Sequence, residues 1–282
     1  MINVIAKLLS YLPLSIIHHF GAFFGWIFHL LIPKTKAILV ENLQQSQLFP
    51  DEGACDQAIK KNIAESGKTI IESLAIWAAD DKRALSWVKQ VNGWNHVESA
   101  VAQGKGIIFL TPHLGSFEIT SVYYAAKYPI TVLYRPPRKK WLEILMNKGR
   151  SKGQVHLAPT NRAGVKMLLQ ALNRGEAIGI LPDQIASKGE GEWVPFFGRP
   201  AYTMALVSRL AEKTGAAIVM AFGERLPKGR GFVIHLTKLD TADVATPALL
   251  NQAVEAQVRA APIQYLWNYN RHKGYLQPDQ PI

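Results

Sequence analysis

The stretch Gly106-Ile-Ile-Phe-Leu-Thr-Pro-His-Leu-Gly-Ser-Phe-Glu118 decides how this chain folds. Its first six residues form an apolar run that is typical of a buried strand. Pro112 ends the strand, Gly115 permits a sharp turn, and the serine that follows is a favourable helix N-cap. The pattern predicts a strand that leads directly into a helix. His113 then lies in the turn, and Glu118 lies in the first turn of the helix.

On both sides of this stretch, short apolar runs alternate with helical patterns. The predicted strands are Gly106–Thr111, Ile130–Tyr134, Gln154–Leu157, Ala177–Leu181, Ala216–Phe222 and Gly231–Thr237. The predicted helices are 36–78, Ser116–Lys127, Lys139–Lys152, Arg162–Arg174, Thr203–Thr214 and Pro247–Ala260. Strands that alternate with helices predict an α/β fold with a largely parallel sheet flanked by helices. In such folds, functional sites lie beyond the carboxyl ends of the strands.

The segment from Leu8 to Ile32 contains no Asp, Glu, Lys or Arg and is long enough to cross a bilayer as a helix. Lys34 and Lys36 follow it, which predicts that this end lies on the cytoplasmic side. Pro13 and three histidines interrupt the apolar pattern. We expect a membrane anchor that either spans the bilayer or lies half-immersed. A buried core helix and a cleaved signal peptide are the alternatives.

The composition favours negatively charged partners, because 32 Lys and Arg outnumber 21 Asp and Glu. Phospholipid surfaces, phosphorylated substrates and acidic proteins all fit this charge. The sequence has no helix-turn-helix pattern, zinc-finger spacing or stacking motif that would indicate nucleic acid. It also lacks the glycine-rich loops of nucleotide sites and the paired ligands of metal sites, so we expect no cofactor and no metal. Cys55 is the single cysteine, which excludes an internal disulfide.

His113 and Glu118 are the residues on which a reaction could depend. If the turn brings them together, the carboxylate holds the imidazole in one tautomer and stabilises its cation. The other ring nitrogen then takes a proton from a substrate hydroxyl. Backbone N–H groups of the turn are candidates to stabilise an oxyanion. The spacing by itself is equally consistent with a purely structural His–Glu pair.

Five segments occur in a characteristic order and spacing along the chain. They are Thr111-Pro-His-Leu-Gly-Ser-Phe-Glu118, Leu133-Tyr-Arg-Pro136, Leu181-Pro-Asp-Gln184, Val194-Pro-Phe-Phe-Gly198 and Ile263-Gln-Tyr-Leu-Trp267. Together they resemble the bacterial lipid A late acyltransferases, also called the lauroyl/myristoyl acyltransferase family. The resemblance spans nearly the whole chain and includes the hydrophobic segment before the first motif.

The resemblance implies an acyl carrier protein or CoA thioester as donor and a phosphorylated glycolipid, a lipid A precursor, as acceptor. It also implies a fold like that of glycerol-phosphate acyltransferases and a site at the cytoplasmic face of the inner membrane. His113 and Glu118 match the catalytic residues of the family, and Arg150 and Asp183 match positions that support them. We therefore divide the chain into a membrane-anchoring helix at 1–34 and an acyltransferase domain at 35–282.

Three further features are open to two interpretations each. The basic segment 134–140, which includes Arg135, either holds lipid phosphates or an acidic carrier protein, or is a solvated surface. Asp183 either orients Arg150 or caps a turn. The loop 190–198 either lines an acyl channel or packs against the core.

Two rival functions remain at this stage. The first is acyl transfer to a lysophospholipid or to another glycolipid, which the same catalytic pair would serve. The more distant rival is a non-catalytic membrane-binding protein, which the positive charge and the apolar N-terminal segment would permit.

Overall fold

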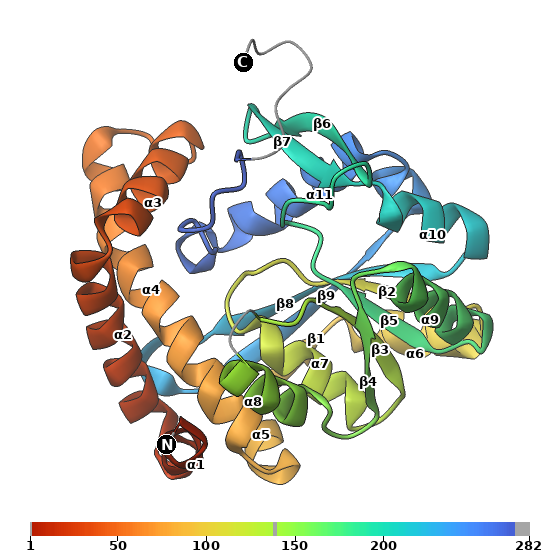
Figure 1. The fold of residues 1–282 in the computed structure, drawn as a ribbon, viewed down its shortest axis with the longest axis horizontal. Helices are drawn as coiled ribbons and strands as arrows, with labels where there is room; N and C mark the ends of the chain where they lie inside the picture. Colours follow the sequence, from red (N-terminus) through yellow and green to blue (C-terminus); the bar gives the residue numbers. More distant parts are fainter. Residues whose placement is uncertain (1, 138–139, 274–282) are drawn as a thin grey trace.

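The computed structural model describes residues 2–137 and 140–273. Its main helices are α1 Ile2–Tyr11, α2 Leu14–Leu31, α3 Pro33–Gln45, α4 Glu52–Ala78, α5 Asp81–Ser86, α6 Trp94–Gln103, α7 Phe117–Ala125, α8 Lys140–Arg150, α9 Arg162–Asn173, α10 Leu206–Thr214 and α11 Pro247–Ala260. The strands are β1 Val88–Asn92, β2 Ile107–Leu110, β3 Ile130–Tyr134, β4 Val155–Pro159, β5 Ala177–Ile180, β6 Gly191–Phe196, β7 Arg199–Met204, β8 Ala217–Arg225 and β9 Phe232–Leu239. Helices cover both faces of a central sheet, and α2 to α4 form a further layer beside it (Figure 1).

The seven-stranded sheet has the order β1-β9-β8-β2-β5-β3-β4. The neighbouring strands from β8 to β4 are parallel to one another. Strand β9 runs antiparallel to β8, and β1 runs parallel to β9. This confirms the predicted α/β fold with a largely parallel sheet. Each of the six predicted strands is present in the sheet within a few residues of its expected bounds.

Strand β2 shows why the sheet needs helices on both faces. Its side chains alternate, because successive residues of a strand point to opposite sides. Ile108 and Leu110 join a core formed with α9, α10 and α11. Ile107 and Phe109 join a second core formed with α6 and α7. A strand buried on both faces is apolar at every position, which is the pattern in the sequence.

The structure differs from the predicted elements at residues 191–204 and within the predicted helix 36–78. Residues 191–204 form the hairpin β6–β7 where we expected a loop and the start of a helix, so α10 begins at Leu206. Phe197 and Gly198 both have positive φ, as a two-residue hairpin turn requires. The predicted helix 36–78 is two helices, because Asp51 caps the start of α4 by accepting from the Ala54 N–H.

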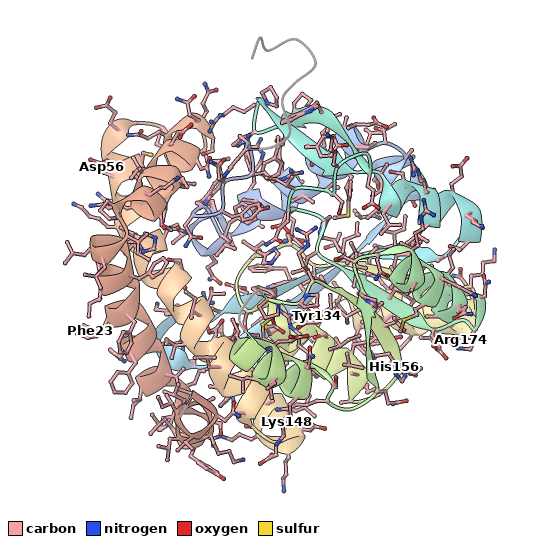
Figure 2. All side chains as sticks on the ribbon, viewed as in Figure 1. Phe23, Asp56, Tyr134, Lys148, His156 and Arg174 are labelled. Carbon is pink, nitrogen blue, oxygen red and sulfur yellow. The ribbon has the colours of Figure 1, made fainter. Side chains whose placement is uncertain are left out.

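Helix α2 packs along α4 through glycines. A Cβ atom at Gly67 of α4 would lie 2.1 Å from the carbonyl oxygen of Gly21 and 2.5 Å from Cα of Gly25. The absence of side chains at these positions lets the two backbones approach closely. By length and composition α2 is able to cross a membrane. Its side away from α4 is exposed and apolar, and Phe23 lies at that outer edge (Figure 2).

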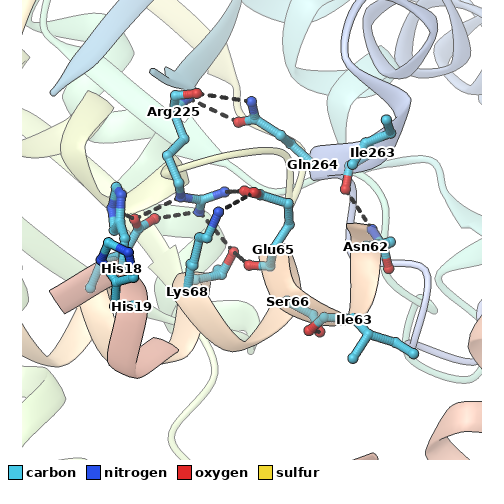
Figure 3. Close-up of polar contacts among 12 residues, drawn as sticks. His18, His19, Asn62, Ile63, Glu65, Ser66, Lys68, Arg225, Ile263 and Gln264 are labelled. Carbon is cyan, nitrogen blue, oxygen red and sulfur yellow. Dashed lines mark hydrogen bonds and ion pairs between the residues drawn. The ribbon is translucent and has the colours of Figure 1, made fainter. Parts of the chain in front are cut away.

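A buried ionic cluster joins this helical layer to the sheet. Arg225, at the end of β8, places its guanidinium 2.5 Å from Glu65 and 2.5 Å from Glu72 of α4. His18 of α2 lies 2.9 Å from the same Glu72 carboxylate. The backbone of Arg225 exchanges two hydrogen bonds with the side-chain amide of Gln264, as Figure 3 shows. The cluster therefore connects α2, α4, β8 and the C-terminal segment.

The Glu72 carboxyl provides a pH-dependent contribution to stability. Burial alone would raise its pKa, but Arg225 and His18 outweigh burial and lower the pKa to about 2. The ionised Glu72 carboxylate therefore stabilises the fold at pH values above 4.5, the ordinary pKa of this carboxyl group. This stabilisation is lost as the pH falls toward 2.

We expect Glu72→Gln to lower the free energy of unfolding at pH 7 by about 3–5 kcal/mol, because the buried Arg225 guanidinium loses its main partner. The deficit should shrink as the pH falls from 4.5 toward 2. Urea unfolding of the detergent-solubilised wild-type and Glu72→Gln proteins, across this pH range, measures the deficit in the free energy of unfolding. Glu98→Gln, at an exposed position of α6, is the matched control. A deficit that stays constant with pH would contradict this assignment.

Candidate active site

The turn after β2 is fixed from both sides by backbone hydrogen bonds. The Gly115 N–H donates to the carbonyl of Gln264 at 3.0 Å, and the Ser116 N–H donates to the carbonyl of Gly223 in β8 at 2.8 Å. The Leu266 N–H donates to the carbonyl of His113 at 3.0 Å. Gly115 has a φ of +58°, and a Cβ there would lie 2.2 Å from the Gly223 oxygen, so only glycine fits. His113 therefore sits on a rigid turn.

The carboxylate that contacts the His113 ring belongs to Asp183. Its two oxygens accept from Nδ1 of the ring at 2.9 Å and from the His113 backbone N–H at 2.8 Å. The strand register explains the contact. Leu110 of β2 pairs with Ile180 of β5. His113 lies three residues after Leu110, and Asp183 lies three residues after Ile180, so both reach the same edge of the sheet. Asp183 is 3% exposed, so water does not compete for this contact.

This geometry corrects the expected arrangement of the pair. We expected Glu118 to orient His113, but Asp183 occupies the Nδ1 side of the ring, and the Glu118 carboxylate is bound by Arg150. The reason is the position of Glu118 on α7, where its side chain meets α8 instead of the turn. Neither earlier interpretation of Asp183 is correct, since it neither orients Arg150 nor simply caps a turn.

The electrostatics of Asp183 suit a residue that orients a base. Burial alone would raise the pKa of its carboxyl, but the charge and hydrogen bonds of His113 outweigh burial and lower the pKa. Asp183 is therefore ionised at neutral pH. An ionised partner keeps the proton on Nδ1 and leaves Nε2 with its lone pair.

Gln184 contacts the opposite nitrogen of the ring. Its side-chain nitrogen lies 3.2 Å from Nε2 of His113. An amide N–H that donates to Nε2 requires this nitrogen to be unprotonated, which agrees with the tautomer that Asp183 imposes. A substrate hydroxyl that donates to Nε2 would take the place of this amide. The His113 side chain is 13% exposed, so a substrate is able to reach it.

Tyr265 supports Asp183 from the C-terminal segment. Burial and the negative charge of Asp183 raise the pKa of its phenol well above the ordinary value. The phenol therefore stays neutral beside the carboxylate. Asn62 of α4 fixes this segment by donating to the carbonyls of Ile263 and Tyr265, each at 2.7 Å; the Ile263 bond is visible in Figure 3.

Glu118 and Arg150 form a buried ion pair beside the turn. The Arg150 Nε lies 3.1 Å from each Glu118 oxygen, and an Nη donates to the same carboxylate. The guanidinium also lies over the rings of Trp77 and Tyr134, at 5.5 and 5.7 Å from their centroids. Burial alone would lower the pKa of Arg150, but Glu118 outweighs burial and raises it. Arg150 therefore stays charged in an apolar setting.

An apolar hollow extends from this ion pair into the molecule between α7 and the sheet. Glu118, Arg150 and Thr111 stand among its polar lining residues. Phe117, whose ring contacts the His113 ring at 4.8 Å between centroids, also lines it. The walls are mainly aromatic and aliphatic: Trp94, Phe109, Tyr123, Tyr124, Ile130, Val132, Val155, Leu157, Leu181, Ile234 and Leu236. We call this the α7 hollow. Its lining suits a hydrocarbon chain.

Residues 1–274 match the family described as bacterial lipid A biosynthesis acyltransferase. The chain belongs to this family. The match confirms the predicted family and enzyme class, so the protein is an acyltransferase of lipid A biosynthesis.

Three relatives of the acyltransferase are similar over most of their length. The lipid A biosynthesis lauroyltransferase of Escherichia coli (strain K12) is 27% identical over 271 residues, 93% of this chain and 87% of the relative. The palmitoleoyltransferase of the same organism is 24% identical over 269 residues, 93% of this chain and 86% of the relative. A lipid A biosynthesis acyltransferase of Haemophilus influenzae is 26% identical over 280 residues, 95% of this chain and 87% of the relative.

The acyltransferase does not bring all predicted site residues together. Arg135 is exposed, and its nearest hydrogen-bond partner is Ser187 Oγ at 3.4 Å, so it does not contact His113. Of the basic segment 134–140, Arg138 and Lys139 lie outside the described residues. Within the residues that the structure describes, no cluster of His, Cys, Asp and Glu could hold a metal ion.

The turn does not offer free N–H groups for an oxyanion. The N–H groups of residues 113 to 116 donate to Asp183 and to the carbonyls of Pro112, Gln264 and Gly223. The expectation that these N–H groups form the oxyanion hole is therefore wrong. The cationic group nearest the turn that also lines the α7 hollow is the Arg150 guanidinium.

Two residues of the site, Gln184 and Tyr265, had no role in the sequence interpretation. Both occur inside segments that carried the family resemblance, and that resemblance was the available signal. Their contacts with His113 and Asp183 depend on the packing of distant segments, which spacing along the chain does not reveal.

We expect Asp183→Asn to lower kcat by about 10³–10⁴-fold, because an amide no longer enforces the reactive tautomer of His113. His113→Ala and the double variant should be about equally inactive, because residues that act as a unit are not additive. Acyl transfer from a radiolabelled thioester measures this. Asp56→Asn, at an exposed site on α4, is the control and should retain full activity. Full turnover by Asp183→Asn would refute the assignment.

A second experiment distinguishes the contribution of the Glu118–Arg150 ion pair to stability from its contribution to catalysis. Arg150→Met should lower the free energy of unfolding by about 3–5 kcal/mol, because the buried Glu118 carboxylate loses its partner. Adding Glu118→Gln removes that charge and should restore most of the stability. We expect the double variant to remain inactive. Urea unfolding and turnover, measured together, test this, and a stable double variant with near-normal turnover would make the pair purely structural.

Proposed function

We propose that this acyltransferase moves a fatty acyl chain from an acyl carrier protein or CoA thioester to a hydroxyl of a lipid A precursor, with His113 as the general base. The observation that carries the proposal is the arrangement of the His113 ring. Buried Asp183 binds Nδ1, while Nε2 faces a replaceable amide. Since the acceptor alcohol itself attacks the thioester, no Ser or Cys nucleophile is required.

The reaction follows from this arrangement. The Nε2 atom takes the proton of the acceptor hydroxyl while the hydroxyl oxygen forms a bond to the thioester carbonyl carbon. The resulting tetrahedral oxyanion collapses and breaks the carbon–sulfur bond. The imidazolium then returns its proton to the departing thiolate, so the ester and a free thiol are the products. Asp183 stabilises the imidazolium between the two proton transfers.

Glu118 and Arg150 have a supporting role in the proposal. Both line the mouth of the α7 hollow, and Glu118 fixes the direction of the guanidinium by accepting two hydrogen bonds from its Nε and a further one from an Nη. An oriented cation beside a water-poor site stabilises negative charge that develops on the carbonyl oxygen. We assign this to Arg150, since the N–H groups of the turn already have partners.

The α7 hollow is the proposed site of the donor acyl chain. Its cavity volume in this structure is about 50 Å³, below the range of about 300–1,000 Å³ that is usual for ligand pockets, so its lining side chains must move apart to admit an acyl chain. At its far side Trp94 lies against Tyr123 and Tyr128, with ring centroids 5.5 and 6.5 Å apart. Such aromatic bulk closes the hollow and would limit the length of the chain it accepts.

The N-terminal helices are the proposed membrane attachment. Their exposed large apolar side chains are Val4, Ile5, Leu8, Tyr11, Ile16, Phe20, Phe23, Phe24, Trp26, Leu30, Leu31 and Ile32. Because one side of α2 packs against α4, this surface favours a helix that lies in the interface over one that spans the bilayer. The lysines at 34 and 36 favour the cytoplasmic face of the inner membrane.

Mass spectrometry of lipid A from cells with and without the gene tests the function. We expect the deleted strain to lack one secondary acyl chain, and expression of the wild-type protein to restore it. Expression of His113→Ala should not restore it. An unchanged lipid A profile would contradict the proposal. In a purified assay, transfer to lysophosphatidate with none to lipid A precursors would support the rival acceptor instead.

A further inference from the structure

A second hollow lies on the opposite face of the sheet, between α9, α10 and the segment after β5. We call it the α9–α10 groove. Its floor is formed by Leu133, Val165, Leu169, Met204, Leu206 and Leu210. Its cavity volume is about 280 Å³. Leu133, at the carboxyl end of β3, lines this groove and also the α7 hollow. Both hollows therefore border β3 near its carboxyl end.

The groove is directly continuous with the catalytic segment. Ile185 and Ala186, which follow Asp183 and Gln184, form one of its walls. This wall is held in place, because the Ile185 N–H donates to the Tyr269 hydroxyl at 3.2 Å and the Ala186 N–H donates to the Tyr202 carbonyl at 3.3 Å. A ligand in the groove is thus in contact with the chain that orients His113.

The groove is aliphatic at its floor and basic at its rim. Arg209 and Lys213 lie one turn apart on α10, and Arg135 lies across from them after β3; all three are exposed. Glu190 is the acidic residue among the lining residues. Guanidinium and ammonium groups bind phosphate through charge-assisted hydrogen bonds. The groove therefore matches a molecule that has both a hydrocarbon chain and a phosphate.

The chemistry of the groove favours a lipid over a thioester arm or a carrier protein. A pantetheine arm has two amides, which would lose their hydrogen bonds to water against an aliphatic floor. An acidic carrier protein would contact the basic rim and leave the apolar floor empty. An acyl chain that ends in a phosphorylated headgroup fills the floor and pairs with the rim at the same time.

We propose that the α9–α10 groove binds an acyl chain of the phosphorylated lipid acceptor, with a headgroup phosphate held by Arg209, Lys213 and Arg135. This inference rests on the proposed function, since it assigns the acceptor to one side of the sheet and the donor chain to the other. The acceptor hydroxyl then approaches Nε2 of His113 from the side of Gln184.

Steady-state kinetics with two acceptors test the proposal. One acceptor is a lipid A precursor with its phosphates, and the other is the same lipid after dephosphorylation. We expect the double variant Arg209→Ala/Lys213→Ala to raise KM for the phosphorylated acceptor about tenfold or more, because two charge-assisted contacts are lost. KM for the dephosphorylated acceptor and for the thioester donor should change less than about twofold, as should kcat.

A floor variant and a charge-matched control complete the kinetics. Leu169→Trp, which fills the floor, should raise KM for both acceptors and leave KM for the donor unchanged. Lys105→Ala/Lys238→Ala removes the same charge outside the groove, with Lys105 at the opposite edge of the sheet, and should change no parameter. An increase in the donor KM would place the carrier protein on the rim and overturn the proposal. Equal effects on both acceptors from Arg209→Ala/Lys213→Ala would also overturn it.

Binding measurements separate this inference from the function on which it rests. The inactive His113→Ala protein is titrated with the phosphorylated precursor in detergent micelles, with and without the two rim substitutions. Weaker binding on loss of the rim supports the groove even if the wild-type enzyme transfers no acyl chain to this lipid. Rim-independent binding, together with normal transfer by the wild-type enzyme, would refute the groove and leave the function intact.

Discussion

The hydrogen bond between His113 and Asp183 depends on two parallel strands ending in register. Leu110 and Ile180 are paired, and the chain continues three residues beyond each of them to reach His113 and Asp183. The same sheet edge receives the C-terminal segment, which bonds to the turn and supplies Tyr265. A shift of one residue in this register would move Asp183 to the other face and leave the imidazole without a partner.

The fold was largely predictable, whereas the contacts of the site were not. Buried parallel strands have continuous apolar sequences, so β2 and β5 could be predicted from the sequence. The partner of His113 was not evident, because β3 and β4 separate β2 from β5 along the chain while the strands are neighbours in the sheet. Proximity in sequence favoured Glu118, whose position on α7 instead directs it to Arg150. The β6–β7 hairpin was missed because its turn requires a positive φ at Phe197, an unusual choice for an aromatic residue.

In our proposal, the two faces of the sheet bind the two substrates of the enzyme. The α7 hollow is lined mainly by aromatic and aliphatic side chains, as suits a single flexible hydrocarbon chain. The α9–α10 groove has an aliphatic floor and a charged rim, as suits a lipid with a polar headgroup. Phe117 and Glu118, which follow the turn of His113, line the α7 hollow, and Ile185, which follows Asp183 and Gln184, lines the groove. A fold with helices on both faces of its sheet provides such a pair of hollows without a separate domain.

The glycine contact between α2 and α4 has a consequence for how the enzyme works at a surface. Backbones that touch through Gly21, Gly25 and Gly67 hold the apolar helix tightly against α4. Seating that helix in the lipid headgroups would therefore set both the height and the tilt of the active site above the bilayer. The enzyme would then diffuse along the membrane as one rigid body, and its substrates would have to move to reach His113.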